Sequence, residues 1–315
     1  MNKNFVAITI GDMKGIGIEL LIKLFIEKKI KNFILFTNLI LLNEYLKKNK
    51  LKIKIQNIKK ESNIIKTNSN IFFVYDYKAK NNSENSYKSL KESYKYVKKF
   101  NLKGIINLPI NKEIIIKNIN KKFIGQTEYY QQIDKKKVSN MIFIYKNLII
   151  TTLTTHIELN KVSRELSKKN NVYNKIINLN NTLVKYLKIK KPKIIISGIN
   201  PHASENNIFG NEETKFLIPE IDKLIKKNIF IKGPYSADSI LNNRNLNKYN
   251  CFVFCYHDQA LVAYKYISKN RGINFTGGLS ILRVSPDHGT AYDLVGKNIA
   301  ESKSLINCYK FLNEY

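Results

Sequence analysis

Residues 5–48 read FVAITIGDMKGIGIELLIKLFIEKKIKNFILFTNLILLNEYLKK, and this stretch decides the fold. Short apolar runs at 5–10 and 33–38 have the length and composition of buried strands, and longer runs with helical spacing follow them at 16–29 and 39–48. A strand followed by a helix, repeated, is typical of βα units whose strands lie parallel in a sheet. We therefore predict an α/β protein with a mostly parallel sheet.

The same alternation continues along the rest of the chain. Further strand-like runs lie at 71–77, 104–110, 141–153, 192–199, 228–233 and 251–256, and helical patterns lie near 84–100, 171–188, 211–227 and 301–314. A length of 315 residues suits one large α/β domain or two moderate domains that share a cleft.

The cysteines and the apolar segments indicate the compartment. Cys251, Cys255 and Cys308 form no CxxC pair, and their odd number favours neither a disulfide framework nor a cysteine zinc site. The first residues hold no signal-peptide core, and no segment approaches the roughly 18 apolar residues of a membrane helix. We expect a cytoplasmic protein.

The formal net charge of +30 raises a second class of function, nucleic-acid binding. However, lysines are spread through the predicted strands, helices and loops, and the arginines are few: Arg164, Arg244, Arg271 and Arg283. We prefer the interpretation of a solvated lysine coat that attracts anionic substrates.

Three of the four histidines directly follow an apolar strand pattern: His156, His202 and His257. In parallel α/β sheets, ligands bind outside the carboxyl ends of the strands, so these imidazoles are expected to converge. Imidazole is a common ligand of zinc and similar ions, and three of them leave positions open for substrate and water. Any one of them alone would be interpreted as a strand cap, but the set predicts a catalytic metal.

Two further segments carry polar or glycine-rich motifs. The glycines of GDMKGIG, at 11–17, follow a strand and open a helix, an arrangement that suits an anion or a tight turn equally well. Their spacing is not that of the GxGxxG dinucleotide fingerprint. The segment 273–300 places Asn274, Arg283, Asp287 and His288 among apolar residues, and Lys265 precedes it. Lys265 and Arg283 are therefore candidates to grip a phosphate or carboxylate.

Together these motifs resemble the 4-hydroxythreonine-4-phosphate dehydrogenases of pyridoxal phosphate biosynthesis. The resemblance extends over nearly the whole chain in collinear order, with GQTE at 125–128, TTHIEL at 154–159, GINPHASENNIFGNEE at 198–213, GPYSADS at 233–239, YHDQALVAYK at 256–265 and SPDHGTA at 285–291. The resemblance implies a homodimer with its active site near the interface, and oxidation of 4-phosphooxy-L-threonine by NAD or NADP followed by loss of carbon dioxide.

The resemblance also implies roles for individual residues. A divalent ion (zinc, cobalt or magnesium) is expected on His156, His202 and His257, with Lys265 and His257 as the catalytic residues. Substrate binding is expected from Gln126, Thr127, Lys265, Asn274 and Arg283.

The isocitrate and isopropylmalate dehydrogenases belong to the same fold superfamily, and DHGTAYDLVGKNIA is similar to their cofactor loop. This likeness implies NAD contacts from Asp287, His288, Gly289 and Asn298. It also implies two α/β domains with a cleft between them. We expect the first to span 1–125 with 275–315, and the second to span 126–274 and carry most metal and substrate residues and the dimer interface.

The sequence departs from the family pattern in places. The usual GHTE reads GQTE, so Gln126 stands where a histidine is expected, and a glutamine cannot relay a proton. The TGPVHK-like segment reads NLPINK at 107–112, and the EPAGIGPE-like stretch reads DMKGIGIE. Two alternatives follow: a dehydrogenase of a threonate or erythronate phosphate, and a catalytically silent relative.

Overall fold

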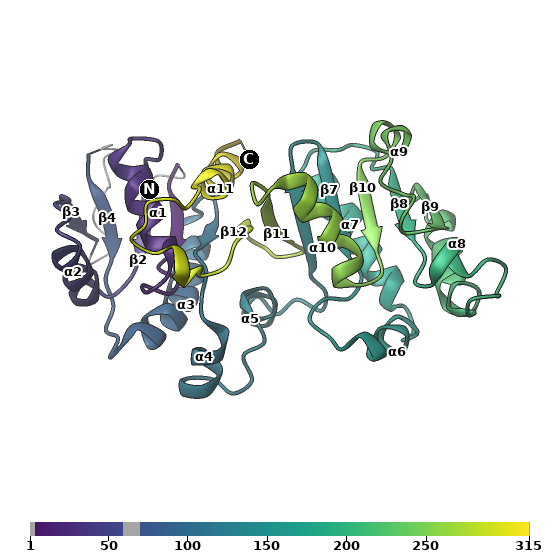
Figure 1. Ribbon diagram of the computed structural model, residues 1–315, viewed down its shortest axis with the longest axis horizontal. Helices are drawn as coiled ribbons and strands as arrows, with labels where there is room; N and C mark the ends of the chain where they lie inside the picture. Colours follow the sequence, from purple (N-terminus) through teal and green to yellow (C-terminus); the bar gives the residue numbers. More distant parts are fainter. Residues whose placement is uncertain (1–3, 59–69, 315) are drawn as a thin grey trace. The chain divides into compact units, whose positions relative to one another are not determined.

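The computed structural model describes residues 4–58 and 70–314, and the chain divides into two compact units (Figure 1). The first unit comprises Met1–Asp134 with Ser280–Tyr315, and the second comprises Lys135–Leu279. Both units are α/β, and most of their strand pairs are parallel, as predicted.

In the first unit the strands lie in the order β3-β4-β2-β1-β5-β12, and all these pairs are parallel. The strands β1 and β2 are buried along their whole length, as expected of continuous apolar runs covered on both faces. The strands are β1 (Val6–Thr9), β2 (Phe33–Phe36), β3 (Ile55–Asn57), β4 (Phe72–Tyr75), β5 (Ile105–Asn107) and β12 (Arg283–Pro286). The helices are α1 (Ile16–Ile26), α2 (Leu39–Lys48), α3 (Asn82–Phe100), α4 (Lys112–Asn118), α5 (Gln126–Ile133) and α11 (Lys303–Glu314), with a 3-10 turn at Tyr292–Leu294.

In the second unit the strand order is β11-β6-β7-β10-β8-β9. The strands β7, β10, β8 and β9 are parallel, whereas β6 pairs antiparallel with both β7 and β11. The strands are β6 (Asn140–Tyr145), β7 (Leu148–Thr152), β8 (Ile194–Ser197), β9 (Ile231–Tyr235), β10 (Cys251–Phe254) and β11 (Ile273–Gly277). The helices are α6 (Val162–Leu166), α7 (Asn171–Lys185), α8 (Ile218–Lys226), α9 (Asn243–Lys248) and α10 (His257–Ser268), with short turns at Leu159–Lys161, Pro201–Ser204 and Glu213–Leu217.

The unit boundaries differ from those expected at 126 and 274. Helix α5 belongs to the first unit because Tyr130 is fully buried there and its hydroxyl accepts a hydrogen bond from Asn107 at 3.0 Å. Strand β11 belongs wholly to the second unit because it pairs with β6 along its length, from Ile273 to Gly277. Gln126 and Thr127 therefore lie in the first unit, not the second.

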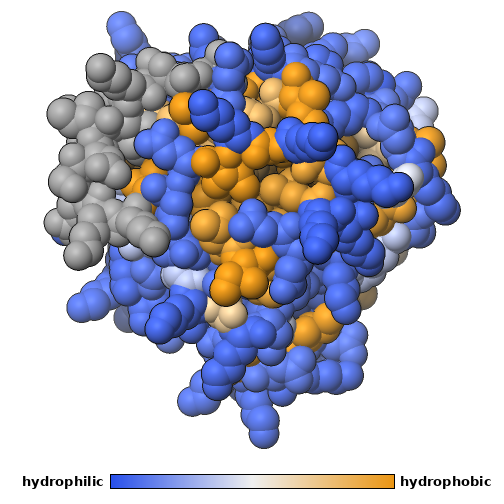
Figure 2. Space-filling model, turned by 90° about the vertical axis from the view of Figure 1, so that its left-hand side faces the viewer, coloured by the Kyte–Doolittle hydropathy of each residue, from blue (hydrophilic) through white to orange (hydrophobic). Residues whose placement is uncertain are grey.

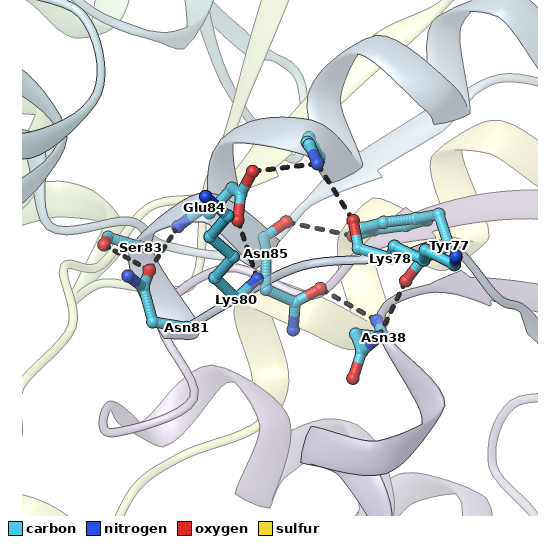
Figure 3. Close-up of polar contacts among 9 residues, drawn as sticks. Asn38, Tyr77, Lys78, Lys80, Asn81, Ser83, Glu84 and Asn85 are labelled. Carbon is cyan, nitrogen blue, oxygen red and sulfur yellow. Dashed lines mark hydrogen bonds and ion pairs between the residues drawn. The ribbon is translucent and has the colours of Figure 1, made fainter.

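Asparagines cap several of the helices. Asn38 and Asn81 accept hydrogen bonds from backbone amides in the first turns of α2 and α3, both at 3.0 Å. The two caps are linked through α3, because Asn85 accepts a hydrogen bond from the Asn38 amide at 2.8 Å (Figure 3). Tyr77 completes this link, since its hydroxyl donates to the Asn85 carbonyl at 2.9 Å (Figure 3). These asparagines thus stabilise the starts of α2 and α3.

One face of the first unit is largely hydrophilic (Figure 2). On the face that Figure 2 turns to the viewer, hydrophilic side chains surround a smaller apolar area. Within residues 4–58 and 70–314, no helix has the length and apolar character needed to span a bilayer.

Candidate active site

Three neighbouring parallel strands of the second unit end at the same edge of the sheet and lead into the three predicted metal ligands. Strand β10 lies between β7 and β8 and is parallel to both. His156 follows β7, His257 follows β10 at the start of α10, and His202 follows β8. The parallel topology therefore brings all three segments to one edge, as the strand patterns predicted.

Two side chains brace these strand ends. Thr154 ties the segment after β7 to the end of β10, because its hydroxyl donates to the Cys255 carbonyl at 2.8 Å. Gln259 ties β10 to β8. Its Oε1 accepts hydrogen bonds from the Cys255 amide at 2.9 Å and the Ser197 hydroxyl at 3.1 Å, and its Nε2 donates to the Gly198 carbonyl at 3.0 Å. Neither Thr154 nor Gln259 was predicted from the sequence to belong to a site.

The rings of His156 and His257 lie together, with centroids 5.7 Å apart and planes inclined by 44°. A zinc-bound ring nitrogen lies about 2 Å from the ion, so two imidazoles of one tetrahedral site have centroids roughly 5 Å apart. The observed spacing is compatible with a shared ion. The Nδ1 atom of His257 is also 2.8 Å from Oδ1 of Asp258, a contact that can fix the tautomer of the ring.

His202 does not join this pair. Among the residues that the structure describes, no three histidine, cysteine, aspartate or glutamate side chains form a group that could hold a metal ion. The His202 ring instead lies beside Phe209, with centroids 6.0 Å apart. The structure therefore brings together two of the three predicted ligands, and the full three-histidine set remains a prediction.

The segment that carries His202 has an unusual backbone. Residues 202–207 all have positive φ, between 41° and 73°. For residues other than glycine, this conformation costs about 1 kcal/mol or more each, so the segment must be held from outside. Glu213, which is buried, anchors the two residues that precede this segment: it accepts hydrogen bonds from the amides of Ile199 and Asn200 at 2.8 and 2.9 Å, and from the Asn200 side chain at 2.9 Å.

Two predicted substrate residues lie in the second unit. Lys265 is in α10, and its Nζ is 3.4 Å from Oδ1 of Asn270. Asn274 is in β11, and its side-chain oxygen is buried without a hydrogen-bond partner among the described residues. Because buried polar atoms are nearly always paired, this oxygen is a candidate for contact with a ligand.

The other predicted substrate residues gather around Arg283 in the first unit. Its Nη2 donates to Oε1 of Gln126 at 2.8 Å, and its Nη1 donates to Oγ1 of Thr127 at 3.2 Å. Its Nε donates to Oδ1 of Asn107, a residue that was not predicted from the sequence to belong to a site. The structure thus places three predicted residues in contact and adds a fourth.

Arg283 is 1% exposed. Burial lowers the pKa of its guanidinium to about 10, so the group is still charged at neutral pH. The three acceptors named above are neutral, whereas the carboxylate of Glu128 is close enough to favour the charged form of the guanidinium. A buried cation of this kind favours the approach of an anion, which would offset the cost of its desolvation.

The predicted cofactor residues form one segment after β12. Asp287 is buried, and its backbone amide donates to the Ser304 hydroxyl at 2.8 Å. The Nδ1 atom of His288 is 3.0 Å from the Gly289 carbonyl, and Asn298 accepts a hydrogen bond from Lys23 at 2.9 Å. A Cβ atom at Gly289 would meet nothing within 4 Å, so space is open beside its backbone.

This segment packs against the GDMKGIG loop at 11–17. The Ile16 amide, at the start of α1, donates to the Thr290 carbonyl at 2.9 Å. The Tyr292 hydroxyl donates to Oδ2 of Asp12 at 2.6 Å. Two motifs that are far apart in the sequence therefore form one surface of the first unit.

Comparisons with known proteins show the family of this chain. A family model described as "Pyridoxal phosphate biosynthetic protein PdxA" matches residues 29–312. A 4-hydroxythreonine-4-phosphate dehydrogenase of Sulfurihydrogenibium sp. is 32% identical over 308 residues, 95% of this chain and 94% of that protein. A Clostridium botulinum protein provisionally named D-threonate 4-phosphate dehydrogenase is 30% identical over 329 residues, 100% of this chain and 97% of that protein.

Solved structures support the fold. A 4-hydroxythreonine-4-phosphate dehydrogenase from Burkholderia phymatum is 26% identical, with a TM-score of 0.78 over 99% of this chain and 97% of that chain. A β-decarboxylating dehydrogenase from Thermococcus kodakarensis is 12% identical, with a TM-score of 0.51 over 99% of this chain and 83% of that chain. The predicted likeness in fold to the β-decarboxylating dehydrogenases is thereby confirmed. Since both the family model and a relative of 32% identity extend over most of its length, this chain belongs to the PdxA family of pyridoxal phosphate biosynthetic proteins.

Proposed function

We propose that this chain is an NAD-dependent dehydrogenase that oxidises 4-phosphooxy-L-threonine to 2-amino-3-oxo-4-phosphooxybutanoate. The hydride passes to NAD and the hydroxyl proton is released. The resulting β-keto acid then loses carbon dioxide to give 3-amino-2-oxopropyl phosphate. The observation that carries this proposal is the pairing of His156 and His257 at the ends of adjacent parallel strands, in a chain 32% identical to a dehydrogenase of this substrate.

The side chains divide the work of binding and catalysis. Arg283 is proposed to bind the phosphate, Lys265 is proposed to bind the substrate near its reacting groups, and the buried oxygen of Asn274 is proposed to accept a hydrogen bond from the substrate. Binding the phosphate away from the reacting carbon supplies the binding energy that orients the alcohol. Lys265 and His257 are the side chains that we propose to act at the reacting groups.

A divalent ion is part of this proposal, with His156 and His257 as ligands and His202 as the predicted third. Zinc, cobalt or magnesium held there would favour loss of the hydroxyl proton and offset the negative charge that develops during decarboxylation. Spare coordination positions would accept the substrate.

We assign the NAD site to the surface that the 287–298 segment forms with the loop at 11–17. Asp287, His288, Gly289 and Asn298 are the proposed contacts. The open space at Gly289 and the start of α1 suit the close approach of a negatively charged cofactor. Comparing NAD with NADP in the assay below would test the choice of cofactor.

We further propose a cytoplasmic homodimer, in which α10 contributes to the interface. Val262 and Tyr266 lie one turn apart on α10 and are 72% and 85% exposed, an unusual exposure for large apolar side chains. Tyr266→Lys should convert the dimer to a monomer, as measured by light scattering. Leu261→Lys is the comparison variant: because Leu261 is buried, this change should destabilise the fold itself.

The function is tested by NADH formation from 4-phosphooxy-L-threonine and D-threonate 4-phosphate, with and without a chelator. We expect faster turnover of the amino-containing substrate and loss of turnover with the chelator. Elemental analysis should find one divalent ion per chain, lost in His156→Ala and His257→Ala. His288→Ala is the matched control, because His288 lies in the other unit and should leave the ion in place. Absence of turnover with either substrate in the metal-loaded protein would refute the proposal.

A further inference from the structure

We infer that Asn107 is a positioning residue for Arg283, and that Asn107 and Gln126 form a coupled pair through this arginine. The inference rests on the proposed role of Arg283 in binding the substrate phosphate. Neither residue was expected at its position from the family pattern, yet both present a carboxamide oxygen to the same guanidinium.

The first step is the way Asn107 is held. Its side chain is fully buried at the end of β5, the strand that pairs with β12. Its Nδ2 donates to the Thr9 hydroxyl at 3.1 Å and to the Tyr130 hydroxyl at 3.0 Å. A rotation of the Asn107 carboxamide by 180° would turn its NH₂ group toward the guanidinium, so that two donors would face each other. Asn107 therefore presents a fixed oxygen to Arg283.

The second step is the way Gln126 is held. Its Nε2 donates to the Leu108 carbonyl at 3.1 Å, while its Oε1 accepts from Arg283 at 2.8 Å. Leu108 is the next residue after Asn107, so one short segment orients both carboxamides. A glutamine at this position supplies one donor and one acceptor at once, which is also what a neutral imidazole could supply.

The third step is the geometry of the guanidinium. The Nε and Nη2 atoms lie on the same edge of this planar group, and they bond to Asn107 and Gln126 respectively. A shift that improves one of these bonds moves the other donor away from its acceptor. The contribution of each carboxamide thus depends on the other, and a change at position 107 alters the consequence of a change at 126.

This coupling predicts the outcome of restoring the family residues. A threonine at 107 is shorter than asparagine and offers a single hydroxyl, so it cannot bond to Thr9, Tyr130 and Arg283 in the same arrangement. Gln126→His alone should therefore weaken phosphate binding, because the imidazole meets a guanidinium still held by Asn107. The double variant, Asn107→Thr with Gln126→His, should bind phosphate more tightly than expected from adding the affinity losses of the two single variants.

The test is a double-mutant cycle with Asn107→Thr, Gln126→His and the double variant. Dissociation constants for inorganic phosphate are measured by calorimetry, and unfolding by urea is followed in parallel. We expect each single change to weaken phosphate binding about ten-fold, the scale of one hydrogen bond to a charged group. We expect the phosphate affinity of the double variant to fall by clearly less than the product of the two single-variant factors. We also expect its unfolding midpoint to fall by less than the sum of the two single-variant shifts.

Two controls separate positioning from a merely structural role. Asn140→Ala removes an equally buried amide in the other unit, so it should lower the unfolding midpoint without changing the phosphate affinity. Asn107→Asp keeps the shape and lets the Thr9 and Tyr130 hydroxyls donate to the new carboxylate. It should fold but bind phosphate far more weakly, because the carboxylate neutralises Arg283.

The outcomes distinguish this inference from the proposed function. Additive effects in both phosphate affinity and unfolding would overturn the coupling. An unchanged phosphate affinity in Asn107→Thr would overturn the positioning role. If the wild-type protein binds no phosphate, the assigned role of Arg283 is contradicted instead. The coupling between Asn107 and Gln126 is then tested by the unfolding midpoints of the double-mutant cycle alone.

Discussion

The hydroxyl of Tyr292 donates a 2.6 Å hydrogen bond to Asp12, a residue 280 positions earlier in the chain. Burial and this bond to a carboxylate both raise the pKa of Tyr292, so the hydroxyl keeps its proton at neutral pH. Asp12 also accepts from the Lys14 amide at 2.9 Å, which shapes the loop at 11–17. The bond therefore fixes the 287–298 segment against the turn that opens α1.

Removing this bond with Tyr292→Phe should affect the cofactor more than the substrate. We expect the KM for NAD to rise about ten-fold, the scale of one hydrogen bond to a charged group, with a smaller change in the KM for substrate. Steady-state kinetics with each reactant varied in turn measures this difference. Tyr309→Phe is the matched control, because its hydroxyl also joins distant segments, donating to the Lys31 carbonyl at 2.6 Å. Equal rises in both KM values would count against the proposed cofactor surface.

Gln259 is expected to matter through the strand ends that it joins. Gln259→Leu keeps the size of the side chain but leaves the Ser197 hydroxyl, the Cys255 amide and the Gly198 carbonyl without this partner. We expect the free energy of unfolding to fall by about 1–3 kcal/mol. Zinc affinity, measured by equilibrium dialysis, should fall as well, because the segments with His202 and His257 lose their brace. Gln132→Leu, at an exposed position, should change neither quantity.

The three cysteines should react slowly in the native protein. All are buried, and burial raises the pKa of each thiol, that of Cys255 to about 12. Since the thiolate is the reactive form, labelling by a disulfide reagent at pH 8 should be at least about 100-fold slower than for free cysteine. In the protein unfolded in urea, all three thiols should react at once, each releasing one equivalent of the reagent's thiol. One rapidly reacting equivalent in the native protein would contradict the burial of these thiols.

The parts of the fold that could be predicted from sequence are those with a strong apolar pattern. The runs at β1, β2, β8 and β10 are continuous and buried, so their strand character was evident. Strands β11 and β12 were missed because INFTG and RVSP contain polar residues, glycine or proline. Helix α10 was missed because its sequence begins with the polar residues of the YHDQ motif.

The candidate site could be predicted only in part. His156 and His257, whose rings the structure brings together, were predicted because they follow apolar strands. Arg283 was predicted from its polar segment, and its partners Gln126 and Thr127 were predicted from the family motifs. Asn107 could not be predicted as a site residue because asparagine is abundant throughout this chain. Glu213 could not be predicted because a lone glutamate has no characteristic spacing to other residues. Their importance comes from burial and from partners far away in sequence, which only the folded chain shows.

Arg283 is expected to tolerate no conservative replacement. Lysine keeps the charge but has a single ammonium group in place of the planar fork that contacts Asn107, Thr127 and Gln126. Arg283→Lys should therefore leave buried acceptors unsatisfied, lower the free energy of unfolding by about 1–3 kcal/mol and raise the KM for substrate about ten-fold or more.

The control for this change is Arg244→Lys, because Arg244 is exposed and lies in the other unit. A surface arginine makes few obligatory hydrogen bonds, so its replacement should change the free energy of unfolding by no more than about 0.5 kcal/mol. Urea denaturation and substrate kinetics of both variants give the comparison. If Arg283→Lys behaved like Arg244→Lys in both measurements, the buried guanidinium would be neither a structural anchor nor the phosphate ligand.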